Sequence, residues 1–270
     1  MMKKYINYNE GKIYYSDKGE GEAIILLHGY LETSEIWAGF ADKLSGKFRV
    51  ICVDLPGHGL SEVYSVNHSM EFMAGAIACL MENLHLPKAF ITGHSLGGYV
   101  ALAFLELYPD MLSAYCLFHS HPFADRPEVV ANRKREIKVV RAAKKHLLYP
   151  GNISRMYSTV NLEKFGDDLR RSEEIAATIS DEGIIAVLNG MMNRPSRLKV
   201  MEQGRVPCLW ILGRHDNYIS CDDIILKVSL PANSRLEILE NSGHMGFIEE
   251  QDLSVELISD FVSGMGSGDA

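Results

Sequence analysis

The sequence lacks long apolar runs. Although 47% of its 270 residues are hydrophobic, no stretch approaches the roughly 20 consecutive apolar residues that a helix needs to cross a bilayer. Lys3 and Lys4 give the start of the chain a positive charge, but no apolar segment follows them, so we expect no secretory signal. We therefore expect a cytoplasmic protein without a membrane partner, whose apolar residues form one core large enough for a domain with an insertion.

Positive charge and cysteine are scarce as well. The 27 Lys and Arg residues are outnumbered by 35 Asp and Glu residues, which gives a net charge of -8. Without a basic field to attract phosphates, we expect no nucleic-acid partner. The 5 cysteines form an odd number and show no paired spacing typical of metal sites. We expect no bound metal and mainly buried, reduced thiols, with a single disulfide left open.

What the sequence does have is an alternation of short apolar runs with helical patterns. The runs predict strands, and the intervening segments predict helices. This order is typical of an α/β fold with a mostly parallel sheet flanked by helices. We expect strands at residues 5–8, 12–16, 23–27, 49–54, 89–92, 112–118, 206–212 and 235–239, and helices at residues 34–44, 69–84, 98–108, 221–228 and 246–262.

Residues 121–203 interrupt this alternation, because they have helical spacing throughout and no convincing strand. We expect them to form a helical cap inserted after the sixth strand, with residues 1–120 and 204–263 as the core. The small polar residues 264–270 predict a disordered tail. Ligands of such sheets bind at the carboxyl ends of the strands, so an insertion at that edge would roof a ligand site.

The sequence GHSLG at residues 93–97 lies between a predicted strand and a predicted helix. A serine with glycine two positions away on each side is typical of a nucleophile elbow, a sharp turn that exposes the hydroxyl of Ser95. Gly93 and Gly97 would allow neighbouring backbone to approach closely. Taken alone, the pattern also fits a glycine-rich turn with no chemistry.

A serine nucleophile needs a base, usually a histidine oriented by a carboxylate. His244 lies between the last predicted strand and the last helix, and Asp216 lies just past the preceding strand. Both therefore reach the sheet edge where Ser95 lies, in the chain order serine, aspartate, histidine that an elbow nucleophile predicts. Asp125 and Asp222, each beyond a strand end, stay open as alternative carboxylates.

These motifs resemble those of the α/β-hydrolase superfamily, in its serine-nucleophile branch with a helical cap. The resemblance covers essentially the whole core. It implies Ser95 as nucleophile, His244 as general base and acid, and Asp216 as orienting carboxylate. It also implies an oxyanion hole made by the backbone N–H groups of Tyr30 and Leu96. The resemblance rests on LHGY at 27–30, DLPGHGLS at 54–61, GHSLGG at 93–98, GRHD at 213–216 and SGH at 242–244.

Other side chains near the strand and helix ends are candidates for the substrate pocket. In contrast, we expect His28, His58 and His94 to brace loops rather than to transfer protons. The pocket candidates are Leu31, Tyr99, His119, Ser120, His121, Phe123 and Met245.

The resemblance implies a serine hydrolase that cleaves a small-molecule carboxylic ester or thioester through an acyl-enzyme on Ser95, without a cofactor. Relatives that cleave halides or epoxides use aspartate instead. Leu96 replaces the tryptophan usual in prolyl iminopeptidases. Pyruvate-eliminating relatives usually carry an arginine a few residues after the serine, where this sequence has Gly97, Gly98 and Tyr99. Alternatives are a carbon–carbon bond hydrolase or lyase with the same triad, and a non-catalytic binding protein. The sequence leaves monomer and homodimer open.

A cationic stretch runs through the predicted cap, from Arg133 to Lys145. A solvated helix face explains it most simply. The functional alternative is attraction of an anionic substrate or a membrane surface.

Overall fold

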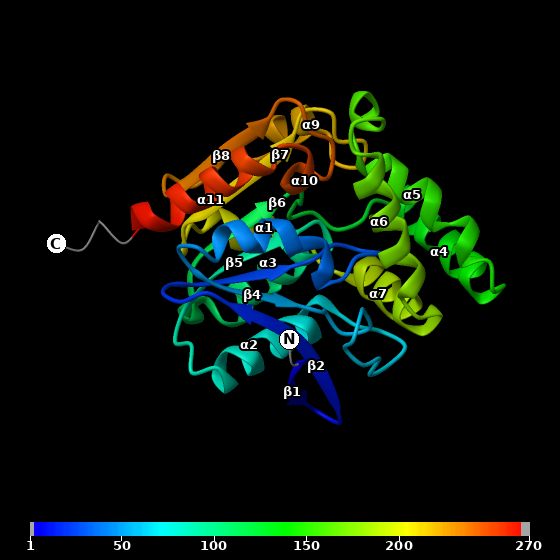
Figure 1. Ribbon diagram of the computed structural model, residues 1–270, viewed down its shortest axis with the longest axis horizontal. Coiled ribbons are helices and arrows are strands. Elements are labelled where there is room, and N and C mark those ends of the chain that lie inside the picture. The colour runs from blue at the N-terminus through cyan, green and yellow to red at the C-terminus, as the bar shows by residue number, and fades with distance from the viewer. Residues whose placement is uncertain (1–2, 266–270) are drawn as a thin grey trace.

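The computed structural model describes residues 3–265. The prediction of a disordered tail at 264–270 is wrong for residues 264 and 265, which belong to the last helix, and residues 266–270 lie outside the described range. Its centre is an eight-stranded sheet in the order β1-β2-β4-β3-β5-β6-β7-β8 (Figure 1). The pairs β1–β2 and β2–β4 are antiparallel, and all other pairs are parallel. The strands are Lys4–Tyr8 (β1), Gly11–Lys18 (β2), Ala23–Leu27 (β3), Arg49–Val53 (β4), Ala89–His94 (β5), Leu112–Phe118 (β6), Cys208–Gly213 (β7) and Ser234–Leu239 (β8).

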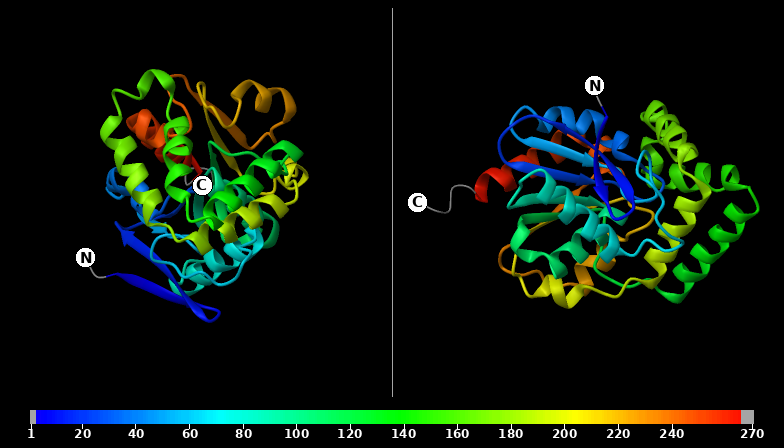
Figure 2. Two further views of the ribbon diagram at one scale, coloured as in Figure 1. Left: turned by 90° about the vertical axis from the view of Figure 1, so that its right-hand side faces the viewer. Right: turned by 90° about the horizontal axis from the view of Figure 1, so that it is seen from below.

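The central strands are apolar because helices cover both faces of the sheet. Every residue of β3 and of β5 is buried. Helices α1 (Ala38–Leu44) and α11 (Gln251–Met265) lie on one face, whereas α2 (Met70–Asn83), α3 (Leu96–Leu107) and α8 (Leu198–Glu202) lie on the other (Figure 2, right). The predicted mostly parallel α/β sheet is thus confirmed.

Four longer helices follow β6 and precede β7. They are α4 (Pro127–Arg141), α5 (Tyr149–Met156), α6 (Gly166–Thr178) and α7 (Asp181–Asn193). Figure 1 shows them together at one end of the sheet, on the right of the view. Helix α4 packs on α7, and α5 packs on α6. Local signals explain their starts, since Pro127 opens α4 and the hydroxyl of Ser180 accepts a hydrogen bond from the Gly183 amide of α7.

Some predicted boundaries are wrong. The last predicted helix is broken at Glu250 into α10 (Gly246–Glu249) and α11. The predicted helix at 34–44 begins as a 3-10 turn, Ser34–Trp37, capped by the hydroxyl of Thr33. Short α9 (Cys221–Lys227) lies where it was predicted. All five cysteines are free, so the open disulfide alternative does not hold.

No single helix within residues 3–265 is both long and apolar enough to cross a membrane. Helices α6 and α7, which meet at 97°, satisfy that length and composition only as a pair.

Candidate active site

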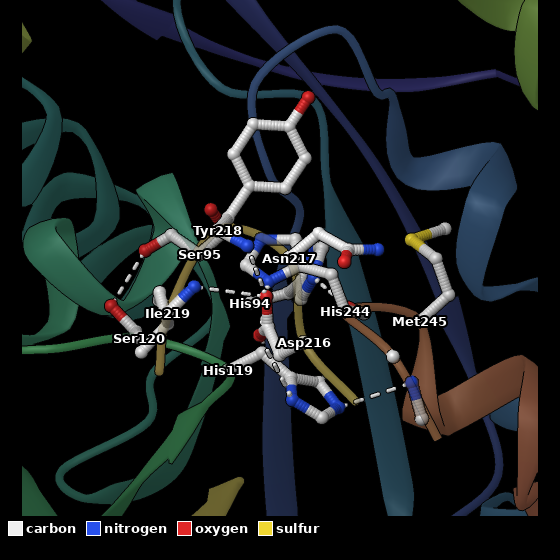
Figure 3. A network of polar contacts seen from close by, with 12 residues as sticks. His94, Ser95, His119, Ser120, Asp216, Asn217, Tyr218, Ile219, His244 and Met245 are labelled. Carbon is white, nitrogen blue, oxygen red and sulfur yellow. Dashed lines mark hydrogen bonds and ion pairs between the residues drawn. The ribbon is translucent and has the colours of Figure 1, made fainter. Parts of the chain in front are cut away.

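Ser95 lies at a strained turn between β5 and α3. Its backbone has φ 48° and ψ −108°, a conformation that a residue other than glycine rarely adopts. Two hydrogen bonds hold it there. The Ser95 amide donates to the carbonyl of Phe118 over 3.0 Å, and the hydroxyl of Ser120 donates to the Ser95 carbonyl over 2.7 Å (Figure 3). The strain is therefore supported by the neighbouring strand β6.

The glycines around Ser95 are required by close backbone approach. A Cβ on Gly93 would lie 2.2 Å from the carbonyl oxygen of Gly97, and one on Gly97 would lie 2.3 Å from that of Leu27. A Cβ on Gly98 would lie 2.3 Å from the hydroxyl of Ser120. The predicted reason for the glycines is thus confirmed, and it extends to Gly98.

Asp216 and His244 meet at the same sheet edge, as Figure 3 shows. His244 Nδ1 lies 2.6 Å from Asp216 Oδ2. The other carboxylate oxygen accepts hydrogen bonds from the amides of Tyr218 (2.7 Å) and Ile219 (2.9 Å). An acceptor at Nδ1 places the proton on that nitrogen and leaves Nε2 free to accept one.

The pKa values of this pair shift in opposite directions. Burial alone would raise the pKa of Asp216, but the neighbouring His244, His119 and the Ile219 amide outweigh burial and hold it below its ordinary 3.8. Burial alone would lower the pKa of His244, but the charge of Asp216 and the hydrogen bond to it raise that pKa above 6.5. The geometry therefore favours an ionised carboxylate beside a basic imidazole.

Ser95 and His244 both line one cavity of about 740 Å³. Among residues 3–265, no hydrogen bond joins the Ser95 hydroxyl to the His244 ring. Such contacts are often long without substrate and shorten when it binds.

His119, at the end of β6, is a second imidazole beside Asp216. The Gly246 amide donates to His119 Nε2 over 3.1 Å, so the ring proton is on Nδ1. That N–H lies 3.7 Å from Asp216 Oδ2, and the ring is fully buried. The ring thus faces the carboxylate rather than the pocket for which it was predicted.

His119, Asp216 and His244 are close enough together for a metal ion, since their ligand atoms lie within 4.8 Å of one another. They do not fit one. Nδ1 of both imidazoles bears a proton, and moving the His119 proton to Nε2 would set it against the Gly246 amide. A metal needs deprotonated ligand nitrogens.

A buried ion pair braces the His244 loop. His94 Nε2 lies 2.8 Å from the His244 carbonyl oxygen, and His94 Nδ1 lies 2.9 Å from Glu32 Oε2. Both partners are acceptors, so His94 carries protons on both nitrogens. Burial would raise the pKa of Glu32, but His94 and the Gly29 amide hold it below its ordinary 4.5. His94 therefore braces a loop, as predicted, whereas Glu32 was missed.

Glu249 is a second missed carboxylate. Its Oε2 accepts from the Gly243 amide over 2.8 Å, next to His244, and Oε1 accepts from the amide of Ser158 and the side chain of Asn161, each over 2.8 Å. This one side chain joins the His244 loop to the inserted helices. Its position five residues after His244, in α10, gave no signal of the contact with residues 158–161.

The two carboxylates left open as alternatives to Asp216 form ion pairs with arginines instead of contacting His244. Asp125 lies between two guanidinium groups, 2.6 Å from Arg133 Nε and 2.6 Å from Arg194 Nη1. Asp222 is largely exposed and pairs with Arg214. Of the three carboxylates, the structure brings Asp216 to His244.

The cavity lining contains some of the predicted pocket residues. Tyr99, His121 and Phe123 contribute to it, together with Tyr30 and side chains of α4, α5 and the loop after β7. The other four predicted pocket residues lie outside the lining, and one of them is His119, whose ring faces Asp216. Leu31 and Met245 are fully buried, and the Ser120 hydroxyl is bound to the Ser95 carbonyl.

The amides of Tyr30 and Leu96, which were predicted to form the oxyanion hole, lie in different local settings. Leu96 is the first residue of α3, so its N–H precedes the first hydrogen bond of that helix. The amide before Tyr30, that of Gly29, is taken by Glu32 over 2.5 Å. Within residues 3–265, neither the Tyr30 nor the Leu96 amide donates a hydrogen bond outside regular elements.

Fold and site together are those of a hydrolase, and comparisons with known proteins agree. A family model described as the alpha/beta hydrolase fold matches residues 22–130. A thermophilic esterase from Thermogutta terrifontis, determined with malate bound, is 25% identical with a TM-score of 0.93, over 98% of this chain and 99% of that one. The chain therefore has the α/β-hydrolase fold, and its similarity to named esterases and hydrolases supports an enzyme of the hydrolase class.

Two relatives show how varied the named activities are. A 2-hydroxy-6-oxononadienedioate/2-hydroxy-6-oxononatrienedioate hydrolase from Pseudomonas putida is 25% identical over 280 residues, covering 96% of each chain. A pimeloyl-[acyl-carrier protein] methyl ester esterase from Xanthomonas oryzae pv. oryzae is 24% identical over 254 residues, covering 92% of this chain and 97% of the relative. These names support a hydrolase acting on small molecules and leave the bond it cleaves open.

Proposed function

We propose that the protein is a serine esterase that cleaves a small-molecule carboxylic ester or thioester. The observation that carries this proposal is the 2.6 Å bond between His244 Nδ1 and Asp216 Oδ2, on a cavity that the strained Ser95 also lines. Strain at a non-glycine residue, a polarised imidazole and a shared cavity together are what covalent catalysis by serine needs.

In the proposed reaction, His244 Nε2 takes the proton from the Ser95 hydroxyl as its oxygen bonds to the substrate carbonyl carbon. The negative charge moves to the carbonyl oxygen, which the amides of Tyr30 and Leu96 would stabilise. His244 then gives its proton to the departing alcohol or thiol, leaving an ester on Ser95. In the second half, His244 takes a proton from water as the water oxygen bonds to the acyl carbon. The bond from that carbon to the Ser95 oxygen then breaks, His244 returns the proton to Ser95, and the acid is released.

We further propose that residues 121–203 act as a cap over this cavity, with residues 1–120 and 204–263 as the core. Side chains of α4 and α5 contribute to the lining together with Ser95 and His244. Glu249 supports this role because it ties the inserted segment at Ser158 to the loop of the base.

A second candidate is hydrolysis of a carbon–carbon bond by the same residues. The Pseudomonas putida relative favours this candidate. It aligns over 96% of the chain and is named as a hydrolase of 2-hydroxy-6-oxo dioates. The ester reading has support from two relatives that are named esterases. The non-catalytic alternative has no support, because Ser95, Asp216 and His244 are all present.

The test measures turnover of a panel of p-nitrophenyl esters, from acetate to octanoate, and separately of one 2-hydroxy-6-oxo-dienoate. The proposal expects turnover of a short ester that disappears in Ser95→Ala, while circular dichroism stays that of the folded protein. Turnover of the dienoate alone would replace the esterase proposal with hydrolysis of a carbon–carbon bond. Turnover of neither substrate class would contradict both.

A further inference from the structure

The cavity has a polar wall built around the Tyr99 ring. Tyr99 belongs to the first turns of α3, one helical turn after Ser95, and its side chain contributes to the lining. The wall continues through His121 and Asp125, which follow β6, and Arg133 of α4. Arg194, which follows α7, lies behind it.

The tautomer of His121 decides which partner donates in its hydrogen bond with the Tyr99 hydroxyl. The Phe123 amide donates to His121 Nδ1 over 3.2 Å, so the ring proton is on Nε2. Burial lowers the pKa of His121 to about 3, so the ring is neutral and has this single proton. Nε2 lies 3.3 Å from the Tyr99 oxygen and donates to it. His121 is the only hydrogen-bond partner of that hydroxyl among residues 3–265, so its own proton is free for a ligand in the cavity.

The same wall has more guanidinium than carboxylate charge. Asp125 alone pairs with both Arg133 and Arg194, at 2.6 Å each. The Arg194 guanidinium carbon lies 3.7 Å over the Tyr99 ring, and its side chain is only 2% exposed. Its Nε and Nη2 have no hydrogen-bond partner in the described part of the chain. The stacked guanidinium places a positive charge directly behind the Tyr99 ring.

The whole cavity shares this excess, in a chain whose net charge is -8. Cationic side chains in the lining outnumber carboxylates although the reverse holds for the full sequence. Arg126 and Lys227 are already paired with Glu128 and Asp223, so the excess lies with the remaining guanidinium groups. An uncharged substrate would leave that excess uncompensated. The cations are Arg126, Arg133, Arg135, Arg155 and Lys227, and the carboxylates are Asp125, Glu136 and Asp223.

We propose that Tyr99 and Arg133 bind a carboxylate of the substrate, away from the bond that is cleaved, with Arg194 as a positioning residue behind Tyr99. The proposal rests on the proposed function and deepens it. The substrate class is the half-ester of a dicarboxylic acid, in which one carboxyl group is esterified and the other is free. Tyr99 donates its hydroxyl proton to the free carboxylate, and Arg133 supplies the balancing charge.

The test compares mono-p-nitrophenyl glutarate with p-nitrophenyl butyrate, which have the same leaving group and similar acyl length. The wild-type enzyme is expected to prefer the glutarate in kcat/KM. Tyr99→Phe keeps the ring under Arg194 and removes only the donor. It should lower kcat/KM for the glutarate on the order of 10- to 100-fold, the range for a hydrogen bond to a charged group, mainly through KM. The butyrate value should change less than about 3-fold.

Tyr218→Phe is the matched control. Tyr218 also contributes to the lining, but its hydroxyl already donates to the Asn152 carbonyl over 2.9 Å. Its loss should leave the ratio of the two substrates unchanged. Arg133→Gln should shift the ratio in the same direction as Tyr99→Phe.

A binding measurement separates this inference from the proposed esterase activity. Ser95→Ala protein should bind glutarate by calorimetry, and Ser95→Ala/Tyr99→Phe should bind it at least about 10-fold more weakly. Glutarate binding without turnover of any ester would contradict the proposed function and keep the carboxylate site. Turnover of both esters with no preference, or an equal loss for both in Tyr99→Phe, would overturn the site.

Discussion

The two sides of the cavity are built differently. On the core side, α3 buries ten of its 12 residues, and its first turns are fixed by the strained Ser95. On the inserted side, α4 buries only Ile137 and Val140 among its 15 residues. A buried element can hold reacting groups to within fractions of an ångström, whereas a half-exposed one can change its side chains at little cost in stability. The core side thus suits the chemistry, and the inserted side suits the choice of substrate.

The largest expected effect comes from removing the nucleophile on the core side of the cavity. Ser95→Ala should reduce turnover of a reactive ester by about 10⁴-fold or more, because the nucleophile is gone. The substitution removes only a hydroxyl group and leaves the surrounding packing intact, so the thermal unfolding midpoint should stay within a few degrees of wild type. Steady-state kinetics with p-nitrophenyl butyrate measure the loss. Residual turnover within 10-fold of wild type would mean that another group is the nucleophile.

Replacing the orienting carboxylate should have the next largest effect. Asp216→Asn should lower kcat by about 10³- to 10⁴-fold, because an amide can stabilise the wrong His244 tautomer and cannot stabilise its charge. Asp222→Asn is the matched control, since that carboxylate is 82% exposed and pairs with Arg214, away from His244. It should retain nearly full activity. The reverse pattern would assign the carboxylate role to Asp222.

The ion pair behind His244 should contribute measurably to the stability of the fold. Glu32→Gln removes the countercharge of the buried His94, which should lower the free energy of unfolding by about 3 kcal/mol. The exposed neighbour Glu35 serves as control, and Glu35→Gln should change it by less than about 0.5 kcal/mol. Urea unfolding followed by tryptophan fluorescence gives both values. Equal stabilities would show that the pair does not brace the core.

The smallest effect is a shift in pH dependence. His244 must be neutral to accept a proton, and Asp216 raises its pKa above 6.5. The value of kcat/KM should therefore be lost as pH falls through a midpoint above 6.5 and be fully present well above it. In Asp216→Asn the raising charge is gone, so the residual activity should have a lower midpoint. A flat profile from pH 5 to 9 would argue against His244 as base.

Much of the core side could be predicted from the sequence because its signals are local. Apolar runs identified the strands, and the glycines around Ser95 indicated close backbone contacts that the structure contains. The strand ends placed Asp216 and His244 at one edge. That prediction needed only the alternation of strands and helices, since parallel strands bring their carboxyl ends together.

The supporting contacts could not be predicted in this way. Glu32 meets His94 62 positions along the chain, and Glu249 meets Ser158 at a separation of 91. Neither carboxylate lies in a recognisable motif, and their partners depend on how distant loops converge. The proton positions on His119 and His121 likewise depend on the amides of Gly246 and Phe123.

The pocket was predicted only in part, for a related reason. Leu31, Ser120 and Met245 are near strand or helix ends, but packing turns them away from the cavity. Proximity in sequence to a strand end places a residue at the correct edge. It does not decide whether the side chain faces solvent space or the interior.

The most direct test of the central claim is covalent labelling with a fluorophosphonate, followed by peptide mass spectrometry. The account predicts one label, on Ser95, formed rapidly in the wild-type enzyme and at least about 10³-fold more slowly in His244→Ala. A folded wild-type protein that stays unlabelled, or that is labelled equally fast without the imidazole, would contradict the proposed cooperation of Ser95, His244 and Asp216.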